Sequence, residues 1–221
     1  MAVMGRLTAP DGCPWDKVQT HKSIRINMIE EAYEAADAID SGDVDNLREE
    51  IGDVLLQAVF HCDIAERTGE FTFSDAVNEL VTKLVTRHTH IFGENKATDP
   101  DSALSFWEKA KAKEKSYDTL SEQLDRLPES FPALLRAQKA YKKSVKAGLK
   151  LTREEIEAKL CDMLKAGVNE DNAGEFLLYA DFLSTAAGAD GEAELGKSAA
   201  EFINEMKRRD ENGELKKDGN K

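Results

Sequence analysis

Apolar residues recur every three or four positions along most of the first 115 residues, which is the spacing of one face of an α-helix. The pattern predicts a first helix over roughly residues 20–39, which stops at Gly42 because glycine relieves the steric cost of leaving a helix. A second helix is expected over roughly residues 46–67, with Asp43 or Asp45 as its cap. The short connection between the two predicts an antiparallel helix pair.

Two more helices are expected before residue 116. A third opens after Thr72 or Ser74 and continues toward Gly93. A fourth begins at Asp99-Pro100, where aspartate caps the helix and proline takes the first helical position. The third helix is predicted to bury one apolar face, which consists of Val77, Leu80, Val81, Leu84 and Val85.

After about residue 116 the chain passes through a polar stretch with two prolines, Pro128 and Pro132, before four further helical patterns follow. We place a domain boundary in that stretch. The predicted organisation is all-α, with one helical module over 1–118 and a second over 119–209. Residues 210–221 are expected to form a disordered tail, because they carry too few apolar residues to offset the entropy of ordering.

Composition and charge argue against several classes of function. The 221 residues are 41% hydrophobic and 33% charged, with a formal net charge of −13. That charge disfavours binding to a nucleic-acid polymer, because such affinity comes from cations that neutralise phosphates. Three widely spaced cysteines without a C-x-x-C pair indicate neither a disulfide framework nor a zinc site, so we expect a cytoplasmic protein. No run of 18 apolar residues occurs, so no membrane partner is expected.

Two acidic pairs lie beside the apolar stripes of the first two helices. Glu31 and Glu34 are three residues apart, as are Glu50 and Asp53, and the pairs occupy matching positions on a helical wheel. If the two apolar stripes pack on each other, all four carboxylates gather at one border of the interface. Four like charges require partial protonation or a compensating cation, and Mg²⁺ or Mn²⁺ prefers such oxygen ligands. Each pair taken alone is more typical of a solvated helix surface.

These motifs resemble the MazG family of nucleoside triphosphate pyrophosphohydrolases. The resemblance rests on EExxE at 30–34 and ExxD at 50–53, and on the runs GCPWDKVQTH, EEIGDVLLQAVFH, KLVTRHTHIFG and FWEKAKAKEK within about the first 115 residues. It implies a helical fold that forms a tight homodimer and hydrolyses NTPs between the α and β phosphates, giving NMP and pyrophosphate. Mg²⁺ is the implied cofactor, with Mn²⁺ as the alternative. Carried over by motif, the metal ligands would be Glu31, Glu34, Glu50 and Asp53, and Glu30 would orient or deprotonate the attacking water.

Basic and aromatic residues in the family-like runs are candidates for substrate binding. Lys83 and Arg87 lie four apart on one helix face and suit the β and γ phosphates, and Lys111 is a further candidate. Exposed Lys and Arg are equally ordinary on outer helix faces. Trp107 could stack on a base or close the bundle, and Trp15 could wall the substrate pocket or anchor the N-terminus.

The second half departs from the pattern. Members of the family often carry two copies of the module, and residues 129–209 resemble a second copy in order and length. Where ExxD should recur, the sequence reads Asn172-Ala173-Gly174-Glu175, so only Glu175 is acidic. One carboxylate cannot hold a hard divalent ion well, so we predict an inactive second module. The degenerate half also leaves open a different class of function, a non-enzymatic helical regulator that binds nucleotides or a partner.

Overall fold

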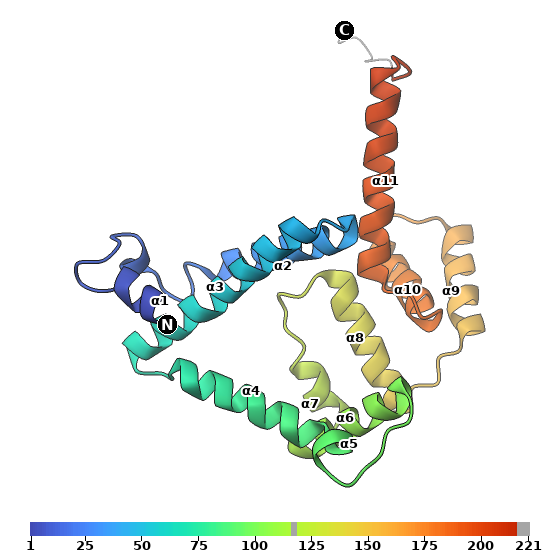
Figure 1. Cartoon of the computed structure of the whole chain (residues 1–221). Helices are drawn as coiled ribbons and strands as arrows, with labels where there is room; N and C mark the ends of the chain where they lie inside the picture. Colours follow the sequence, from blue (N-terminus) through green and yellow to red (C-terminus); the bar gives the residue numbers. More distant parts are fainter. Residues whose placement is uncertain (116–118, 216–221) are drawn as a thin grey trace. The chain divides into compact units, whose positions relative to one another are not determined.

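The computed structural model describes residues 1–115 and 119–215, and every regular element in these two ranges is helical (Figure 1). The all-α class expected from the sequence is therefore confirmed. The chain divides into two compact units, Met1–Glu114 (unit 1) and Lys115–Lys221 (unit 2). The expected boundary at residue 118 and residues 216–221 of the expected tail lie outside the described residues. Within those residues, no helix combines the length and the apolar character needed to cross a bilayer.

Unit 1 is built around a long helical hairpin with shorter helices at its ends. Its elements are α1 (Ala2–Leu7), a 3-10 turn (Asp16–Val18), α2 (Arg25–Ser41), α3 (Val44–Thr68), α4 (Phe73–Arg87), α5 (Thr89–Phe92) and α6 (Pro100–Lys115). In Figure 1, α2 and α3 run side by side, in agreement with their extensive contact. The structure thus confirms the antiparallel pair.

The hairpin turn is fixed by local chemistry. Gly42 adopts φ 72°, a left-handed conformation that side chains rarely tolerate, and ends α2. Asp43 then accepts a hydrogen bond from the Asn46 backbone at 3.0 Å and caps α3. The same chemistry opens α4, where Thr72 and Asp75 form a reciprocal capping box.

Two predicted helix limits are wrong. The first helix begins at Arg25 rather than near Thr20, because the Thr20 and Ser23 side chains and backbone bond each other in a tight turn. The third helix stops at Arg87, since His88 adopts φ −92° and ψ 57° and breaks the helical path before α5. Both corrections concern helix ends, where side-chain hydrogen bonds compete with the helical pattern.

The core of unit 1 lies between α3 and the N-terminal segment. Its buried members are Met4, Ile24, Phe60 and Ile64, with Val59 packed against them. Polar contacts hold the same segment on α3. The buried Asp63 carboxylate accepts from Thr8 at 3.1 Å and from Arg67 at 2.9 Å, and the ring nitrogens of His21 and His61 lie 2.8 Å apart. The loop that carries Trp15 is therefore anchored at both ends.

The predicted buried face of α4 is exposed. Its five apolar residues have between 37% and 51% of their surface accessible: Val77, Leu80, Val81, Leu84 and Val85. Periodicity identified the stripe correctly but assigned it to the core of one chain. Nothing in the described part of the chain covers this face.

Unit 2 is also helical and packs around a core of its own. It contains α7 (Leu120–Asp125), α8 (Ala133–Lys146), α9 (Arg153–Ala166), α10 (Ala173–Ala186) and α11 (Gly191–Glu211). Helix α10 contacts both α8 and α9, with Tyr141 of α8 stacked on Phe182 of α10 at 4.7 Å. Capping boxes at Thr119 and Thr152 open α7 and α9. Residues 210 and 211, assigned to the tail from sequence, are the last turn of α11.

Candidate metal and substrate site

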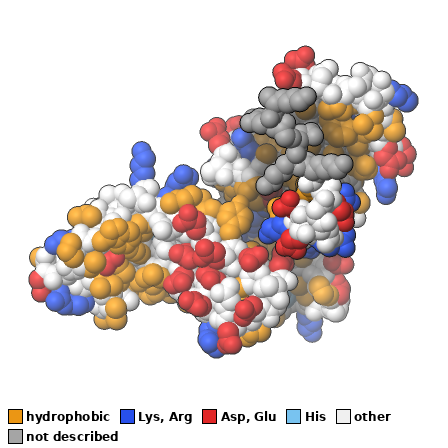
Figure 2. Space-filling view, turned by 90° about the horizontal axis from the view of Figure 1, so that it is seen from above, with side chains coloured by type: hydrophobic (Ala, Val, Ile, Leu, Met, Phe, Trp, Pro, Cys, Tyr) orange, Lys and Arg blue, Asp and Glu red, His pale blue; other side chains and the backbone are white. Residues whose placement is uncertain are grey.

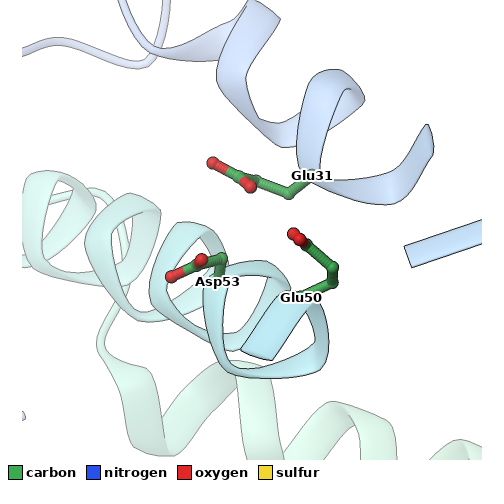
Figure 3. Close-up of side chains that lie close together, drawn as sticks. All are labelled: Glu31, Glu50 and Asp53. Atoms are coloured by element: carbon green, nitrogen blue, oxygen red, sulfur yellow. The ribbon is translucent and has the colours of Figure 1, made fainter. Parts of the chain in front are cut away.

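Three carboxylates converge where α2 faces α3. Glu31 comes from α2, and Glu50 and Asp53 come from successive turns of α3. One oxygen from each lies within 4.8 Å of the others, and the three side chains point toward one another (Figure 3). Within residues 1–115 and 119–215 this is the one group of three or more His, Cys, Asp or Glu side chains close enough to share a cation.

Glu34, the fourth predicted ligand, lies one turn from Glu31 on α2 and is exposed. Its oxygens are outside the group of three, yet its charge reaches both Glu31 and Glu50 and raises the pKa of each. Glu30 also acts on Glu31 in the same direction, though more weakly. The geometric cluster therefore consists of Glu31, Glu50 and Asp53, and Glu34 and Glu30 act on it through their charge.

The apolar stripes of the hairpin are only partly covered: Cys62 on α3 is buried, and Leu47 and Val54 are half-buried. On α2 the buried residues are Ala35 and Ala38, whose small side chains allow α3 to approach. Other apolar residues of the two helices are exposed: Met28, Ala32, Ala36 and Ile39 on α2, and Ile51 and Leu55 on α3. The three converging carboxylates are half-buried, and Figure 2 shows acidic side chains crowded beside exposed apolar ones.

The electrostatics of the cluster favour a cation. The pKa of Glu31 is raised, first by loss of solvent and then by the charges of Asp53 and Glu34. The pKa of Glu50 is raised in the same way, by loss of solvent and then by Glu34 and Asp53. In the described ranges no Lys or Arg forms an ion pair with any of the four carboxylates. Clustered carboxylate oxygens without a basic partner are the donor set that Mg²⁺ and Mn²⁺ prefer.

Sequence reasoning missed Gln57, which joins the cluster from the next turn of α3. Its side-chain Nε2 donates to Glu31 Oε1 at 3.4 Å, and only 7% of the residue is exposed. The bond lowers the pKa of Glu31 and partly opposes the carboxylates. Its position four residues after Asp53 was the available signal, because residues at i and i+4 share a helix face.

The predicted basic residues lie on other helices. Arg87 of α4 forms a forked pair with Glu114 of α6 at 2.8 and 3.0 Å, and its guanidinium lies 5.4 Å from the centre of the Trp107 ring. Lys83 is half-buried one turn before Arg87, and Lys111 is exposed on α6. The structure therefore brings Arg87 and Trp107 together, whereas the carboxylates belong to α2 and α3.

Trp15 lies outside both groups, in the loop before α2. Its ring meets Phe60 edge-on, with the centres 6.3 Å apart, and 57% of the residue is exposed. It borders a pocket of about 150 Å³ that Gln57 also lines. The pocket thus adjoins the carboxylate cluster through Gln57.

Comparison with known proteins decides the family. A family model described as the MazG nucleotide pyrophosphohydrolase domain matches residues 19–92. A nucleoside triphosphate pyrophosphohydrolase of Escherichia coli is 35% identical over 216 residues, which cover 91% of this chain and 82% of the relative. The nucleoside triphosphate pyrophosphohydrolase/pyrophosphatase MazG of Thermotoga maritima is 34% identical over 227 residues, covering 99% of this chain and 86% of the relative. The chain belongs to the MazG family.

Other matches are partial. Uncharacterized protein YabN of Bacillus subtilis is 44% identical over 141 residues, and this chain spans only 29% of its length. The crystal structure of a MazG-related protein from Thermotoga maritima aligns at a TM-score of 0.43 and 27% identity, over 50% of this chain and 94% of that one.

The span matched by the MazG model includes some of the candidate site residues and excludes others. The MazG model covers the whole α2–α3 hairpin, with the four carboxylates, and continues through Lys83 and Arg87 to the end of α5. Trp15, Trp107 and Lys111 lie outside it. The hairpin is accordingly the part of this MazG-family chain in which motif, geometry and family coincide.

Proposed function

We propose that this chain is a divalent-metal-dependent nucleoside triphosphate pyrophosphohydrolase, which cleaves between the α and β phosphates to give NMP and pyrophosphate. The observation that carries the proposal is the convergence of Glu31, Glu50 and Asp53 within a hairpin matched by the MazG model. The printed names of the Escherichia coli and Thermotoga maritima relatives support the same substrate class.

Glu31, Glu34, Glu50 and Asp53 are the residues that would hold Mg²⁺, with Mn²⁺ as a substitute. When bound, such an ion neutralises phosphate charge and lowers the pKa of water. Without the cation, the four carboxylates repel one another, and no ion pair with Lys or Arg among the described residues offsets their charge. The cation and the carboxylates therefore depend on each other for charge balance.

Glu30 is assigned to the attacking water, which it orients and from which it takes a proton. The water oxygen forms a bond to the α phosphorus, and the bond from that phosphorus to the α–β bridging oxygen breaks. Pyrophosphate leaves with the bonding electrons, and NMP retains the new oxygen. Phosphoryl transfer of this kind depends mainly on alignment and charge neutralisation, which the metal held by the carboxylates would supply.

Lys83, Arg87 and Lys111 are assigned to the β and γ phosphates. The Arg87 fork now occupied by Glu114 has the geometry that also fits a phosphate, so a triphosphate competes with Glu114 for the same donors. Trp107, which lies under the Arg87 guanidinium, is proposed to contact the substrate from the same side.

We further propose that the active form is a homodimer. The α4 face and the outward stripes of α2 and α3 leave contiguous helices of unit 1 with exposed apolar residues, and covering such surface stabilises association. A second copy of the chain presents the same faces, as a two-fold interface requires.

Unit 2 is proposed to be inactive. Glu175 of α10 pairs with Lys159 of α9 at 3.0 Å, so its single carboxylate is already neutralised. In the described part of unit 2 no group of three potential metal ligands converges. Dimerisation, a lid or scaffolding are the roles left to this unit.

We place the protein in the cytoplasm. All three cysteines are free, as expected in a reducing compartment. The substrate is a free nucleotide rather than a nucleic-acid polymer, because a net charge of −13 repels a long phosphate backbone.

The test is product analysis by ³¹P NMR with a panel of NTPs, with and without Mg²⁺. The expected result is equimolar NMP and pyrophosphate, dependent on the metal. Release of NDP and orthophosphate would contradict the assigned bond, and tight binding without turnover at any metal concentration would favour a non-enzymatic regulator.

A further inference from the structure

The pocket beside Trp15 is built differently from the acidic cluster. Its volume is about 150 Å³, and most of its wall is apolar, with Trp15, Leu56 and Phe60 among the lining residues. Three polar residues interrupt that wall: Asp16, Asn27 and Gln57. A cavity of about this volume can bind a flat aromatic group, and few polar groups in an apolar wall are typical of sites that orient a small ligand.

Gln57 lines this pocket and carries an unused hydrogen-bond acceptor. An ionised Glu31 carboxylate only accepts hydrogen bonds, so the Gln57 nitrogen must face Glu31 and the Gln57 oxygen must point away from it. That oxygen is buried and has no hydrogen-bond partner. A buried acceptor without a partner costs free energy, which a ligand that donates a hydrogen bond recovers.

The pocket lies one helical turn from the carboxylates on both helices. Gln57 follows Asp53 by four residues on α3, and Asn27 precedes Glu31 by four on α2. One turn advances about 5.4 Å along the axis, a distance comparable to the ribose that separates a base from its α phosphate. A nucleotide with its phosphates at the cluster can therefore extend its base into the pocket.

We propose that this pocket receives the nucleobase and that Gln57 selects bases that carry an exocyclic amine. The proposal rests on the proposed function and adds the part of the substrate that the motifs do not address. Adenine, cytosine and guanine each offer an amine to the Gln57 oxygen. The only ring N–H that uracil or thymine can offer is flanked by two carbonyl oxygens, which would face Gln57 and the Asp16 carboxylate without a hydrogen bond.

The kinetic test compares kcat/KM for ATP, CTP and GTP with that for UTP and dTTP, in the full chain with Mg²⁺. The wild type is expected to prefer the amine-bearing group by roughly tenfold, the effect of one neutral hydrogen bond. Gln57→Met keeps the side-chain length and should bring the groups within about twofold. The matched control is Gln138→Met, a buried glutamine of unit 2, which should keep the wild-type ratio.

A uniform loss for all five substrates in Gln57→Met would show that Gln57 acts only by positioning Glu31, and would overturn the proposal. An unchanged ratio would also overturn it. If the wild type hydrolyses no NTP, the proposed function fails instead.

Binding without chemistry gives an independent readout. In a Trp107→Phe background Trp15 is the remaining tryptophan, so its fluorescence reports on the pocket. In buffer with Mg²⁺, AMP and CMP should quench it saturably, UMP about tenfold more weakly, and Gln57→Met should remove the difference. Equal quenching by all three nucleotides, or none, would overturn the base site even if hydrolysis is intact.

Discussion

The α2–α3 hairpin of unit 1 and the α9–α10 pair of unit 2 handle negative charge in opposite ways. In unit 1, Glu31, Glu50 and Asp53 converge with no basic partner among the described residues. In unit 2, Glu175 is paired with Lys159 at 3.0 Å. A helix pair can therefore balance a carboxylate with a lysine, whereas the carboxylates of unit 1 keep an unbalanced negative charge that protonation or a cation can offset.

The two units also differ in whether a buried carboxylate has a bonding partner. Asp181 of unit 2 is 3% exposed, and both of its carboxylate oxygens lack a hydrogen-bond partner. Burial raises its pKa, as do the charges of Asp190 and Glu192, and Lys142 offsets only part of this. The buried Asp63 of unit 1, by contrast, is paired with Arg67 at 2.9 Å.

The largest expected effect comes from Asp53→Asn, which removes a charged ligand with little change in volume. Turnover should fall roughly 10³-fold, because the weakened site no longer holds the metal ion that balances the charge of the triphosphate. Stability without metal should not fall, since the substitution relieves like-charge repulsion. Initial rates of pyrophosphate release measure the effect, with Asp37→Asn on the exposed side of α2 as the control. Retention of activity in Asp53→Asn would remove this residue from the metal site.

The second-largest effect is expected from a charge placed on the exposed α4 face. Val81→Glu places a charge at the centre of the proposed dimer interface and should weaken dimerisation by roughly 100-fold, because the charge loses solvent on association. Light scattering after size-exclusion chromatography should show a monomer. Val168→Glu, at an equally accessible valine of unit 2, serves as the control and should remain dimeric. A dimer that survives Val81→Glu would locate the interface elsewhere.

A smaller effect is expected from Asp181→Asn. The pKa of Asp181 is raised in the folded state above its value near 3.8 in the unfolded chain. The stability that the protonated carboxyl allows is therefore fully present below pH 3.8 and is lost as the pH rises through the folded-state pKa. At pH 7 the variant should therefore be more stable, by about 1 kcal/mol. The gain should vanish under acidic conditions. Thermal melts at several pH values test this, against Asp162→Asn at an exposed site.

The smallest effect is expected from Glu175→Gln, which breaks the ion pair with Lys159. Both side chains are more than 40% exposed, so solvent screens the pair and its loss costs little stability. Turnover should stay within about twofold of wild type. A large loss of turnover would show that unit 2 contributes to chemistry.

The sequence predicted the hairpin and its carboxylates because both depend on local rules. Asp43 and Gly42 fix the turn, and three-residue spacing sets the acidic pairs on matching faces. It could not predict which face of α2 packs on α3. An apolar stripe looks the same whether it is covered or exposed, so the sequence does not reveal that Ile39 and Leu55 are exposed.

Gln57 escaped prediction for a different reason. No pattern marks a glutamine as buried, and its role depends on the position of Glu31, which lies 26 residues away in the sequence. Long-range contacts of single polar side chains require the packed structure.

The most direct test of the charge imbalance in unit 1 is a titration of the metal-free full chain with Mn²⁺, measured by isothermal titration calorimetry. Saturable binding is predicted for the wild type and for Glu175→Gln, with loss of at least about tenfold in affinity for Asp53→Asn. Equal affinity in all three proteins would place the cation outside the α2–α3 hairpin and contradict this account.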